Sequence, residues 1–592
     1  MLGERGPQRG MFEADTLYRD FVGPNTFYGF LAAQRGTIFT DEDFAGLYCL
    51  ANGRPSVPPS LLATALVLQT YDKVSDDEAK RRADYDLQWK VALGVALDAR
   101  PFAKSTLQEF RAQLVIHDEQ QAIFRKSLEL AKRQGYFTGK RKLTVALDTT
   151  NILGRGAVKD TYNLLADGIV LVVHELAKQV GEPLIDWAEQ AGYGRYVTAV
   201  SLKGHAEIDW SDACARRRLV QAIVADADRL LEQVRIARGR LAADSPEDRA
   251  LAEVAGLLAR VLAQDIERSD DDGPALKQGV ATDRMPAIHD PEMRHGRKSA
   301  SKRFDGHKAD VAVDTDSQLI TAVGVLVGNA PDAEQALTMV EATEATTGCP
   351  VEATIGDCAY GAGGTRQQFH DADRTLVAKV PTLTNQGYLP KTDFSLDLDA
   401  GTCACPAGHT TDDFRPARAG GGVFHFPDAV CGACPLRAQC VRGTVGGRSV
   451  GVHPQEALLQ DARARQASPA FRDYRARRQV VEHRIARLIQ LGLRQARYVG
   501  RAKTLFQVAM AAAVANLTLI MNRADADPSS ALLLAVLGGL VGLLVVLPRQ
   551  PWAFRALFPP SGGHRGDGQA ALLEFPPRLP DIAHTRPLRP RF

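Results

Sequence analysis

The sequence predicts a mixed α/β fold that begins with a helical region. Residues 143–147 alternate apolar side chains with Thr and Ala, which indicates a short, largely buried strand. Residues 303–327 hold two β-rich runs separated by a polar turn, which favours a hairpin. Long helical patterns surround both segments. With 592 residues the chain is long enough for several domains and a substantial core.

Composition limits where partners can bind. Lys plus Arg number 72 against 70 Asp plus Glu, so the net charge is only +2 and any nucleic-acid surface must be local. The nine cysteines are odd in number and five lie within residues 403–440, which argues against a disulfide framework and for a reducing compartment. Residues 1–25 carry repeated charges and lack an apolar signal-peptide core. We therefore expect a cytoplasmic, nucleoid-associated protein.

Residues 1–140 are predicted to be helical. Pro58, Pro59 and Ser60 open an amphipathic pattern over residues 61–71. Residues 75–78 and 105–108 each have the pattern of a capping box, which indicates that new helices begin there. Short helices that restart at polar caps fit a helix-turn-helix-like unit and a plain helical bundle equally well.

An insertion at about residues 160–280 is also predicted to be helical. Apolar positions keep helical spacing over residues 212–268 and restart at Ser245-Pro246, which predicts a helical hairpin. Nothing in this insertion suggests chemistry. After the β-hairpin at 303–327 the pattern predicts a helix over 331–346, a strand ending at Asp357 and a further strand over 375–380. We interpret Asp310 and Asp314 of the hairpin as turn or surface residues.

Three carboxylates are the candidate site. Asp148 is expected at the end of the first strand and Asp357 at the end of a later one, while Glu482 lies on a helix whose Val481 and Ile485 share an apolar face. A single carboxylate at a strand end more often caps a turn. Two such aspartates with a helical glutamate suit a pair of divalent cations, because Mg²⁺ prefers few carboxylates and completes its shell with water or phosphate. Two ions roughly 3.5–4 Å apart can stabilise an in-line phosphoryl transfer.

The order of these residues, with Gly-Asp357-x-x-Tyr360-Gly and Arg478-x-x-x-Glu482, resembles the DDE transposases of bacterial insertion sequences over about residues 40–522. The resemblance implies an RNase H-like mixed sheet flanked by helices, with Asp148, Asp357 and Glu482 as catalytic ligands of two Mg²⁺ or Mn²⁺ ions.

The sequence departs from a common form of the last motif at two positions. Tyr474 is one position early, and Ile489 stands where that form has Lys. Arg487 is a candidate to replace that lysine.

The resemblance also implies an activity and partners. The protein would cleave the terminal inverted repeats of its element and join them to target DNA, acting as a homodimer on DNA and using no small-molecule substrate. Residues 1–140 resemble the N-terminal domain of such transposases, which implies binding to the DNA ends. A structure-specific nuclease with the same core and a DNA-binding relic that no longer cuts are the alternatives.

A cysteine cluster precedes the Glu482 helix. Cys431-x-x-Cys434 with further cysteines in range has the spacing of a small tetrahedral zinc site. The favoured ligands are Cys405, Cys431, Cys434 and Cys440, with Cys403 and His409 as substitutes. The alternative is a group of thiols without metal.

Residues 472–503 are dense in Arg. Beside a metal site such a surface is expected to follow the DNA backbone through phosphate contacts, although a solvated helix face would have the same composition. The arginines predicted to contact DNA are Arg475, Arg478, Arg484 and Arg487.

These patterns divide the chain into an N-terminal domain (1–140), a core (141–382), a Cys-rich insertion (383–470), the last core helices (471–523) and a tail (524–592). Within the tail, residues 531–547 are continuously apolar but contain three glycines. A membrane span takes roughly 17–25 residues, so membrane association is a minor alternative. Residues 549–592 are rich in Pro and Arg, which predicts disorder. We assign the tail no function.

Overall fold

A computed structural model describes residues 1–5, 11–49, 53–138, 141–299, 301–382 and 384–524. By contacts between residues the chain divides into two units, Met1–Asp525 and Ala526–Phe592. The second unit lies outside the described residues, and so does the apolar run at 531–547. The finer domain boundaries inside the first unit stay predictions.

The N-terminal part is helical, as predicted. Its elements are α1 (Ala14–Val22), α2 (Phe27–Ala33), the 3-10 helix η1 (Glu42–Leu47), α3 (Pro59–Asp72), α4 (Asp76–Tyr85), α5 (Leu87–Leu93), α6 (Lys104–Ile116) and α7 (Ala122–Arg133). The Ser75 hydroxyl accepts from the Glu78 N–H (3.1 Å), which confirms a helix start at the first predicted capping box, although the Glu78 carboxylate contacts Arg81 and Arg82. The second was wrong, because α6 begins at Lys104 and Ser105 lies inside its first turn. Buried Leu107 and Phe110 hold α6 in place without a side-chain cap.

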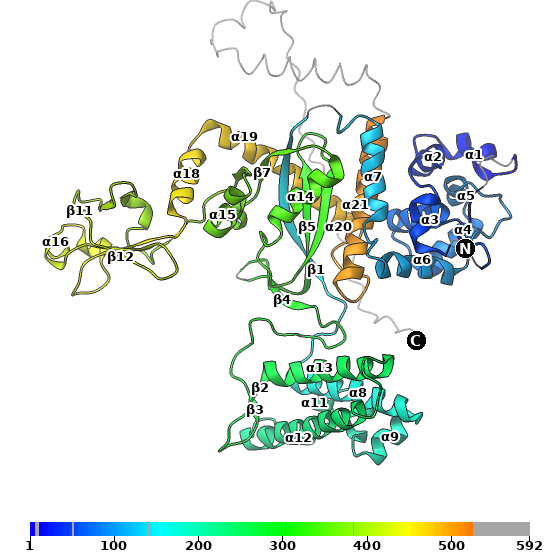
Figure 1. The fold of residues 1–592 in the computed structure, drawn as a ribbon, viewed down its shortest axis with the longest axis horizontal. Helices are drawn as coiled ribbons and strands as arrows, with labels where there is room; N and C mark the ends of the chain where they lie inside the picture. Colours follow the sequence, from blue (N-terminus) through cyan, green and yellow to red (C-terminus); the bar gives the residue numbers. More distant parts are fainter. Residues whose placement is uncertain (6–10, 50–52, 139–140, 300, 383, 525–592) are drawn as a thin grey trace, which may run out of the picture. The chain divides into compact units, whose positions relative to one another are not determined.

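A mixed sheet forms the centre of the first unit (Figure 1). Its strands are β1 (Leu143–Leu153), β4 (Arg294–Arg297), β5 (Arg303–Asp314), β6 (Ile320–Val327), β7 (Val351–Ile355) and β8 (Leu376–Val377). The order is β4-β5-β1-β7-β8, with β6 also paired to β5. β5 pairs antiparallel with β1 and β6, whereas β7 pairs parallel with β1 and β8. The predicted hairpin is therefore β5–β6, and β8 is shorter than predicted.

Helices cover both faces of this sheet. A Cβ placed on Gly324 of β6 would meet Gln335 and Met339, so α14 (Ala336–Thr347) covers that face. This helix begins later than predicted. On the opposite face α20 (Gln479–Gln490) contacts β1 and β5. The last described helix, α21 (Arg501–Ala524), contacts β6.

Among the described residues one helix, over Arg501–Arg523, is long and apolar enough to cross a membrane. In the structure 78% of its apolar window is buried inside the protein, as expected of a core helix.

Two further parts have hydrophobic cores of their own. The insertion consists of α8 (Thr161–Val180), α9 (Leu184–Gln190), α10 (Gly194–Val197), α11 (Leu202–His205), α12 (Ala213–Arg238), α13 (Pro246–Asp265), β2 (Ile266–Glu267) and β3 (Ala275–Leu276). Its α12–α13 pair confirms the predicted helical hairpin.

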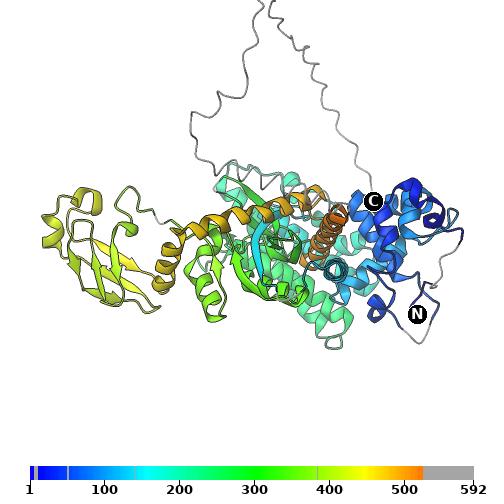
Figure 2. The ribbon, with the colours of Figure 1, turned by 90° about the horizontal axis from the view of Figure 1, so that it is seen from above.

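The Cys-rich part contains η3 (Lys391–Asp393), β9 (Ser395–Asp397), β10 (Thr402–Ala404), β11 (Thr410–Thr411), β12 (Phe414–Pro416), β13 (Gly422–His425), α16 (Asp428–Gly432), α17 (Arg437–Cys440) and β14 (Ser449–Val452). Two helices follow, α18 (Glu456–Gln466) and α19 (Pro469–Arg477). Figure 2 shows α19 and α20 in succession, in gold to orange.

Candidate active site

Strand pairing places the two predicted aspartates beside each other. Ala146 of β1 pairs with Ile355, the last residue of β7, in parallel register. Asp148 and Asp357 each follow two residues later in the chain. Asp148 does not end its strand as predicted. β1 continues to Leu153 because β5 remains paired with it that far. The aspartate therefore lies where β7 has ended and β1 has not.

The other two carboxylates come from different elements. Asp357 precedes a short 3-10 helix, η2 (Cys358–Gly361), and its Oδ1 accepts from the Ala359 N–H (2.8 Å). Glu482 lies in the first turn of α20, where buried Val481, Ile485 and Leu488 fix the helix against the sheet as the apolar pattern predicted. The Glu482 side chain is 51% exposed and can reach solvent or a ligand.

One arginine bridges this group. Arg478 Nη1 donates to Asp148 Oδ2 (3.2 Å), and Arg478 Nη2 donates to Glu482 Oε1. Arg478 stands at the junction between α19 and α20. The positive charge of this guanidinium lowers the pKa of Asp148 and so favours its ionised form.

The pKa of Asp148 depends on the charges of the other two carboxylates. Burial raises its pKa from 3.8 to about 6. Hydrogen bonding from the Thr149 N–H and the charge of Arg478 lower the pKa, whereas the charges of Asp357 and Glu482 raise it. A carboxylate with a raised pKa between like charges is typical of a functional site.

Within the described ranges no group of three or more His, Cys, Asp or Glu side chains is arranged to hold a metal ion. The three carboxylates are nevertheless of the chemical type that binds a metal ion. The positively charged guanidinium of Arg478 already lies between Asp148 and Glu482. Hard oxygen donors of this type suit Mg²⁺ or Mn²⁺.

The opposite face of β1 holds polar residues that the sequence did not reveal. Thr149 Oγ1 and Lys308 Nζ both donate to Asp332 Oδ1 (2.8 and 2.7 Å). Asp310 pairs with Thr149 across the strands and is fully buried, so its interpretation as a turn or surface residue was wrong. Burial raises the pKa of Asp310 to about 8, and the charges of Asp332 and Asp148 add to the shift.

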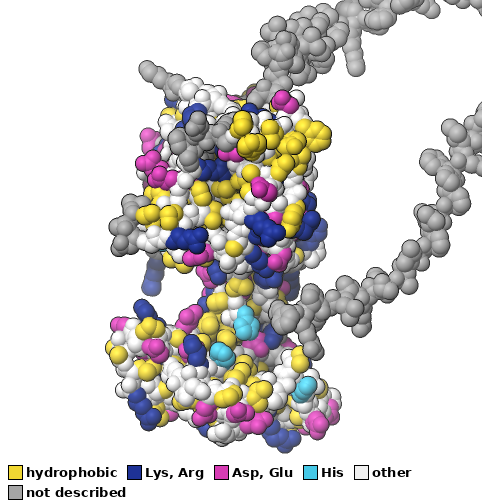
Figure 3. Space-filling view, turned by 90° about the vertical axis from the view of Figure 1, so that its right-hand side faces the viewer, with side chains coloured by type: hydrophobic (Ala, Val, Ile, Leu, Met, Phe, Trp, Pro, Cys, Tyr) yellow, Lys and Arg dark blue, Asp and Glu magenta, His cyan; other side chains and the backbone are white. Residues whose placement is uncertain are grey.

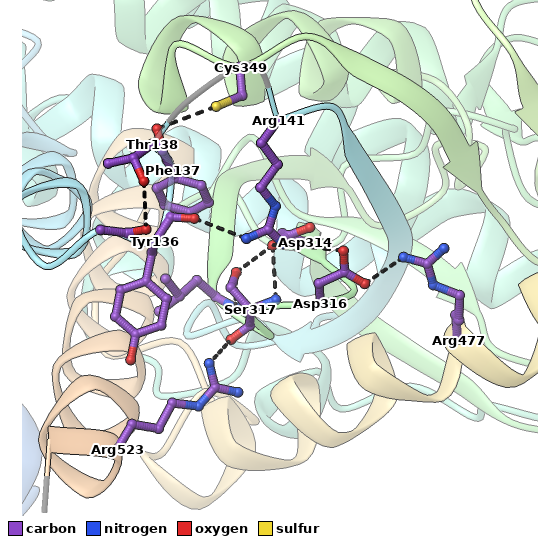
Figure 4. A network of polar contacts seen from close by, with 12 residues as sticks. Tyr136, Phe137, Thr138, Arg141, Asp314, Asp316, Ser317, Cys349, Arg477 and Arg523 are labelled. Carbon is purple, nitrogen blue, oxygen red and sulfur yellow. Dashed lines mark hydrogen bonds and ion pairs between the residues drawn. The ribbon is translucent and has the colours of Figure 1, made fainter. Parts of the chain in front are cut away.

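Asp314 is also fully buried, so it is not a surface residue, but it does hold the turn as predicted, because its backbone carbonyl accepts from the Gln318 N–H (2.8 Å). Its Oδ2 accepts from Arg141 Nη2 (3.0 Å) and from the Ser317 hydroxyl (2.5 Å). Figure 4 shows that Asp316 in the same turn meets both Arg141 and Arg477. This turn therefore ties the start of β1 to the end of α19.

The predicted DNA-contacting arginines separate into two groups. Arg475 and Arg487 extend from α19 and α20 toward solvent, fully or in part. Arg484 was predicted to contact DNA, but it is buried and donates to the Ala515 carbonyl (2.7 Å). Burial lowers its pKa to about 10. Arg484 fixes α20 to α21 and is not available to a phosphate.

The four favoured cysteines line one cavity, although in this structure they are not arranged as a metal site. A cavity of about 20 Å³ is lined by Cys405, Cys431, Cys434 and Cys440 together with His409. Burial raises the pKa of the Cys440 thiol, and the other three cysteines add to the shift. Cys403 does not line this cavity; it lies in the small apolar core that also includes Cys431, and burial raises its pKa to about 11.

Comparisons with known families were made on the whole chain. A family described as "Transposase DDE domain" matches residues 404–521, and one described as "Transposase domain (DUF772)" matches residues 18–113. The first span includes Glu482 and the four cysteines of the cavity but neither Asp148 nor Asp357. Searches of curated proteins and of solved structures give no match.

Proposed function

Since the chain belongs to the DDE-type transposases of insertion elements, we propose that it cuts the ends of its element and joins them to target DNA. Asp148, Asp357 and Glu482 are the proposed catalytic residues, and they would hold two Mg²⁺ or Mn²⁺ ions. The strand order around β1, with antiparallel β5 and β6 on one side and parallel β7 and β8 on the other, supports an RNase H-like core.

The observation that carries this proposal is the shared environment of the three carboxylates. They come from β1, the loop after β7 and α20, yet the charges of two of them act on the pKa of the third. When bound, a pair of divalent cations supplies the positive charge that stabilises the attacking and leaving oxygens of phosphoryl transfer. The role of the chain is to hold the scissile phosphodiester beside Asp148, Asp357 and Glu482 and to keep Asp148 ionised.

DNA would be held by local basic surfaces. Arg475 and Arg487 flank Glu482 in sequence and reach solvent, fully or in part, so they suit contacts to the phosphate backbone. The face shown in Figure 3 mixes Lys and Arg with Asp and Glu, in keeping with a net charge of +2. We assign recognition of the terminal inverted repeats to the N-terminal helices that match the second family. Joining two element ends calls for a homodimer on DNA in the cytoplasm.

We also propose that the cavity lined by Cys405, Cys431, Cys434 and Cys440 holds one structural Zn²⁺. The donor set of four thiols fits zinc, which prefers tetrahedral sulfur and nitrogen ligands. A cavity of about 20 Å³ has room for one small particle the size of a water molecule. Zinc would fasten the short helices α16 and α17, which are too short to be stable alone.

The proposal is tested with the full chain and a labelled duplex taken from the DNA that flanks its gene. With Mg²⁺ or Mn²⁺ we expect a nick at the element end and then joining of the new 3′-OH to a second duplex. A nick without joining would favour the structure-specific nuclease. Binding without any nick would favour the inactive relic.

A further inference from the structure

The guanidinium of Arg478 occupies the space between Asp148 and Glu482. Resting on the function proposed above, we propose that Arg478 takes the place of the metal ions in the free protein and leaves when a DNA phosphate binds it. DNA binding and cation binding would then be coupled through one side chain. The ligand class that moves it is a phosphodiester of the substrate.

The contacts of Arg478 indicate a side chain that can exchange its carboxylate partners for a phosphate, and not one with a permanent structural role. Both of its terminal nitrogens are directed to the carboxylates, and within the described part of the chain its guanidinium makes no other polar contact. The side chain remains 23% exposed, and its partner Glu482 is 51% exposed. An incoming ligand can therefore reach both ends of the bridge. Because Glu482 is half exposed, its ion pair with Arg478 is weak enough to be broken by a competing charge.

The backbone around Arg478 is anchored on both sides. Just before it, Arg477 Nη2 pairs with Asp316 Oδ1 (2.6 Å), and Figure 4 shows this contact at the turn that also binds Arg141. Just after it, Arg484 binds the Ala515 carbonyl. Only the Arg478 side chain, and neither helix, would have to move.

Charge gives the direction of the exchange. A guanidinium and a divalent cation between the same carboxylates repel each other, so each must weaken binding of the other. The fork of an arginine matches a phosphate as well as it matches a carboxylate. A phosphodiester at the site therefore offers Arg478 a new partner and frees Asp148 and Glu482 for cations. The consequence is a site that binds metal more tightly when its substrate is present.

The test measures Mn²⁺ binding to the full chain without DNA, from the electron paramagnetic resonance signal of the free ion. Arg478→Gln should bind Mn²⁺ about tenfold more tightly than the parent, because it loses a competing charge-assisted contact. Arg478→Lys, which keeps the charge, should stay near the parent. Arg472→Gln is the matched control, since it removes a charge from an exposed position of α19, six residues before Arg478. It should leave Mn²⁺ affinity unchanged.

A second arm adds duplex DNA from the element end. The parent should then gain Mn²⁺ affinity, whereas Arg478→Gln should gain little. The proposed exchange is wrong if a folded Arg478→Gln protein binds Mn²⁺ no more tightly than the parent. It is also wrong if DNA does not change the Mn²⁺ affinity of the parent. Asp148→Asn separates the two proposals. If it leaves Mn²⁺ binding intact, the metal site itself is wrong, and if it removes binding while Arg478→Gln has no effect, only the exchange is wrong.

Discussion

Asp148→Asn should stabilise the protein in the absence of divalent cations while abolishing DNA cleavage. Burial raises the pKa of Asp148 from 3.8 to about 6. The ionised carboxylate is therefore less stable in the folded protein than in the unfolded protein. A difference of about two pKa units corresponds to about 3 kcal/mol of lost stability above pH 6. Asparagine keeps the shape and a hydrogen-bond acceptor for Arg478 but carries no charge. The gain is an upper estimate, because the side chain is 23% exposed.

The pH dependence has a defined sign. Because the folded-state pKa is raised, the penalty is complete above about pH 6 and disappears as pH falls below the unfolded value of 3.8. The advantage of Asp148→Asn should fall to about half at pH 5 and below about 1 kcal/mol at pH 4. Urea denaturation, read by hydrogen exchange of peptides from β1 and β5, reports the affected sheet.

The control is Glu352→Gln, which removes a carboxylate that is 60% exposed on β7. It should change stability by less than about 0.5 kcal/mol. Added Mg²⁺ should stabilise the parent and not Asp148→Asn. No gain for Asp148→Asn at pH 8, or a gain that stays constant down to pH 4, would show that the burial argument is wrong.

Three further predictions concern other parts of the chain. Purified protein should contain about one equivalent of zinc, and Cys434→Ser should remove it; metal analysis that finds no zinc in the parent would contradict the site. Arg484→Leu should lower the free energy of unfolding by about 1–3 kcal/mol, because the Ala515 carbonyl loses its buried donor; normal stability with weakened DNA binding would restore Arg484 to the DNA surface. Truncation after Arg523 should leave a soluble protein that still cleaves element ends, and a folded truncation without cleavage would assign the tail a role.

The sequence allowed a good prediction of elements whose pattern is local. The amphipathic spacing around Val481 and Ile485 predicted α20 and its exposed Glu482. The β-rich runs predicted β5–β6, and Ser75 predicted the start of α4. In each case the residues that determine the element are close to one another in the sequence.

What depends on distant partners could not be predicted. Asp148 lies in mid-strand because β5 continues to pair beyond the end of β7, and the buried Asp314 accepts from Arg141, 173 residues away. An arginine pattern alone does not tell exposed Arg475 from Arg484, whose acceptor is a carbonyl 31 residues away. The bridge made by Arg478 joins residues 330 positions apart and has no local signal.

The most direct measurement of the central claim is nicking of a labelled element-end duplex by Asp357→Ala in Mn²⁺. This residue lies outside both family matches, so its role rests on strand register and on its effect on Asp148. We expect binding of the duplex close to that of the parent, because phosphate contacts elsewhere supply the affinity. We expect no nick, because the site loses one of its three carboxylates. Cleavage near the parental rate would remove Asp357 from the site and contradict the proposed chemistry.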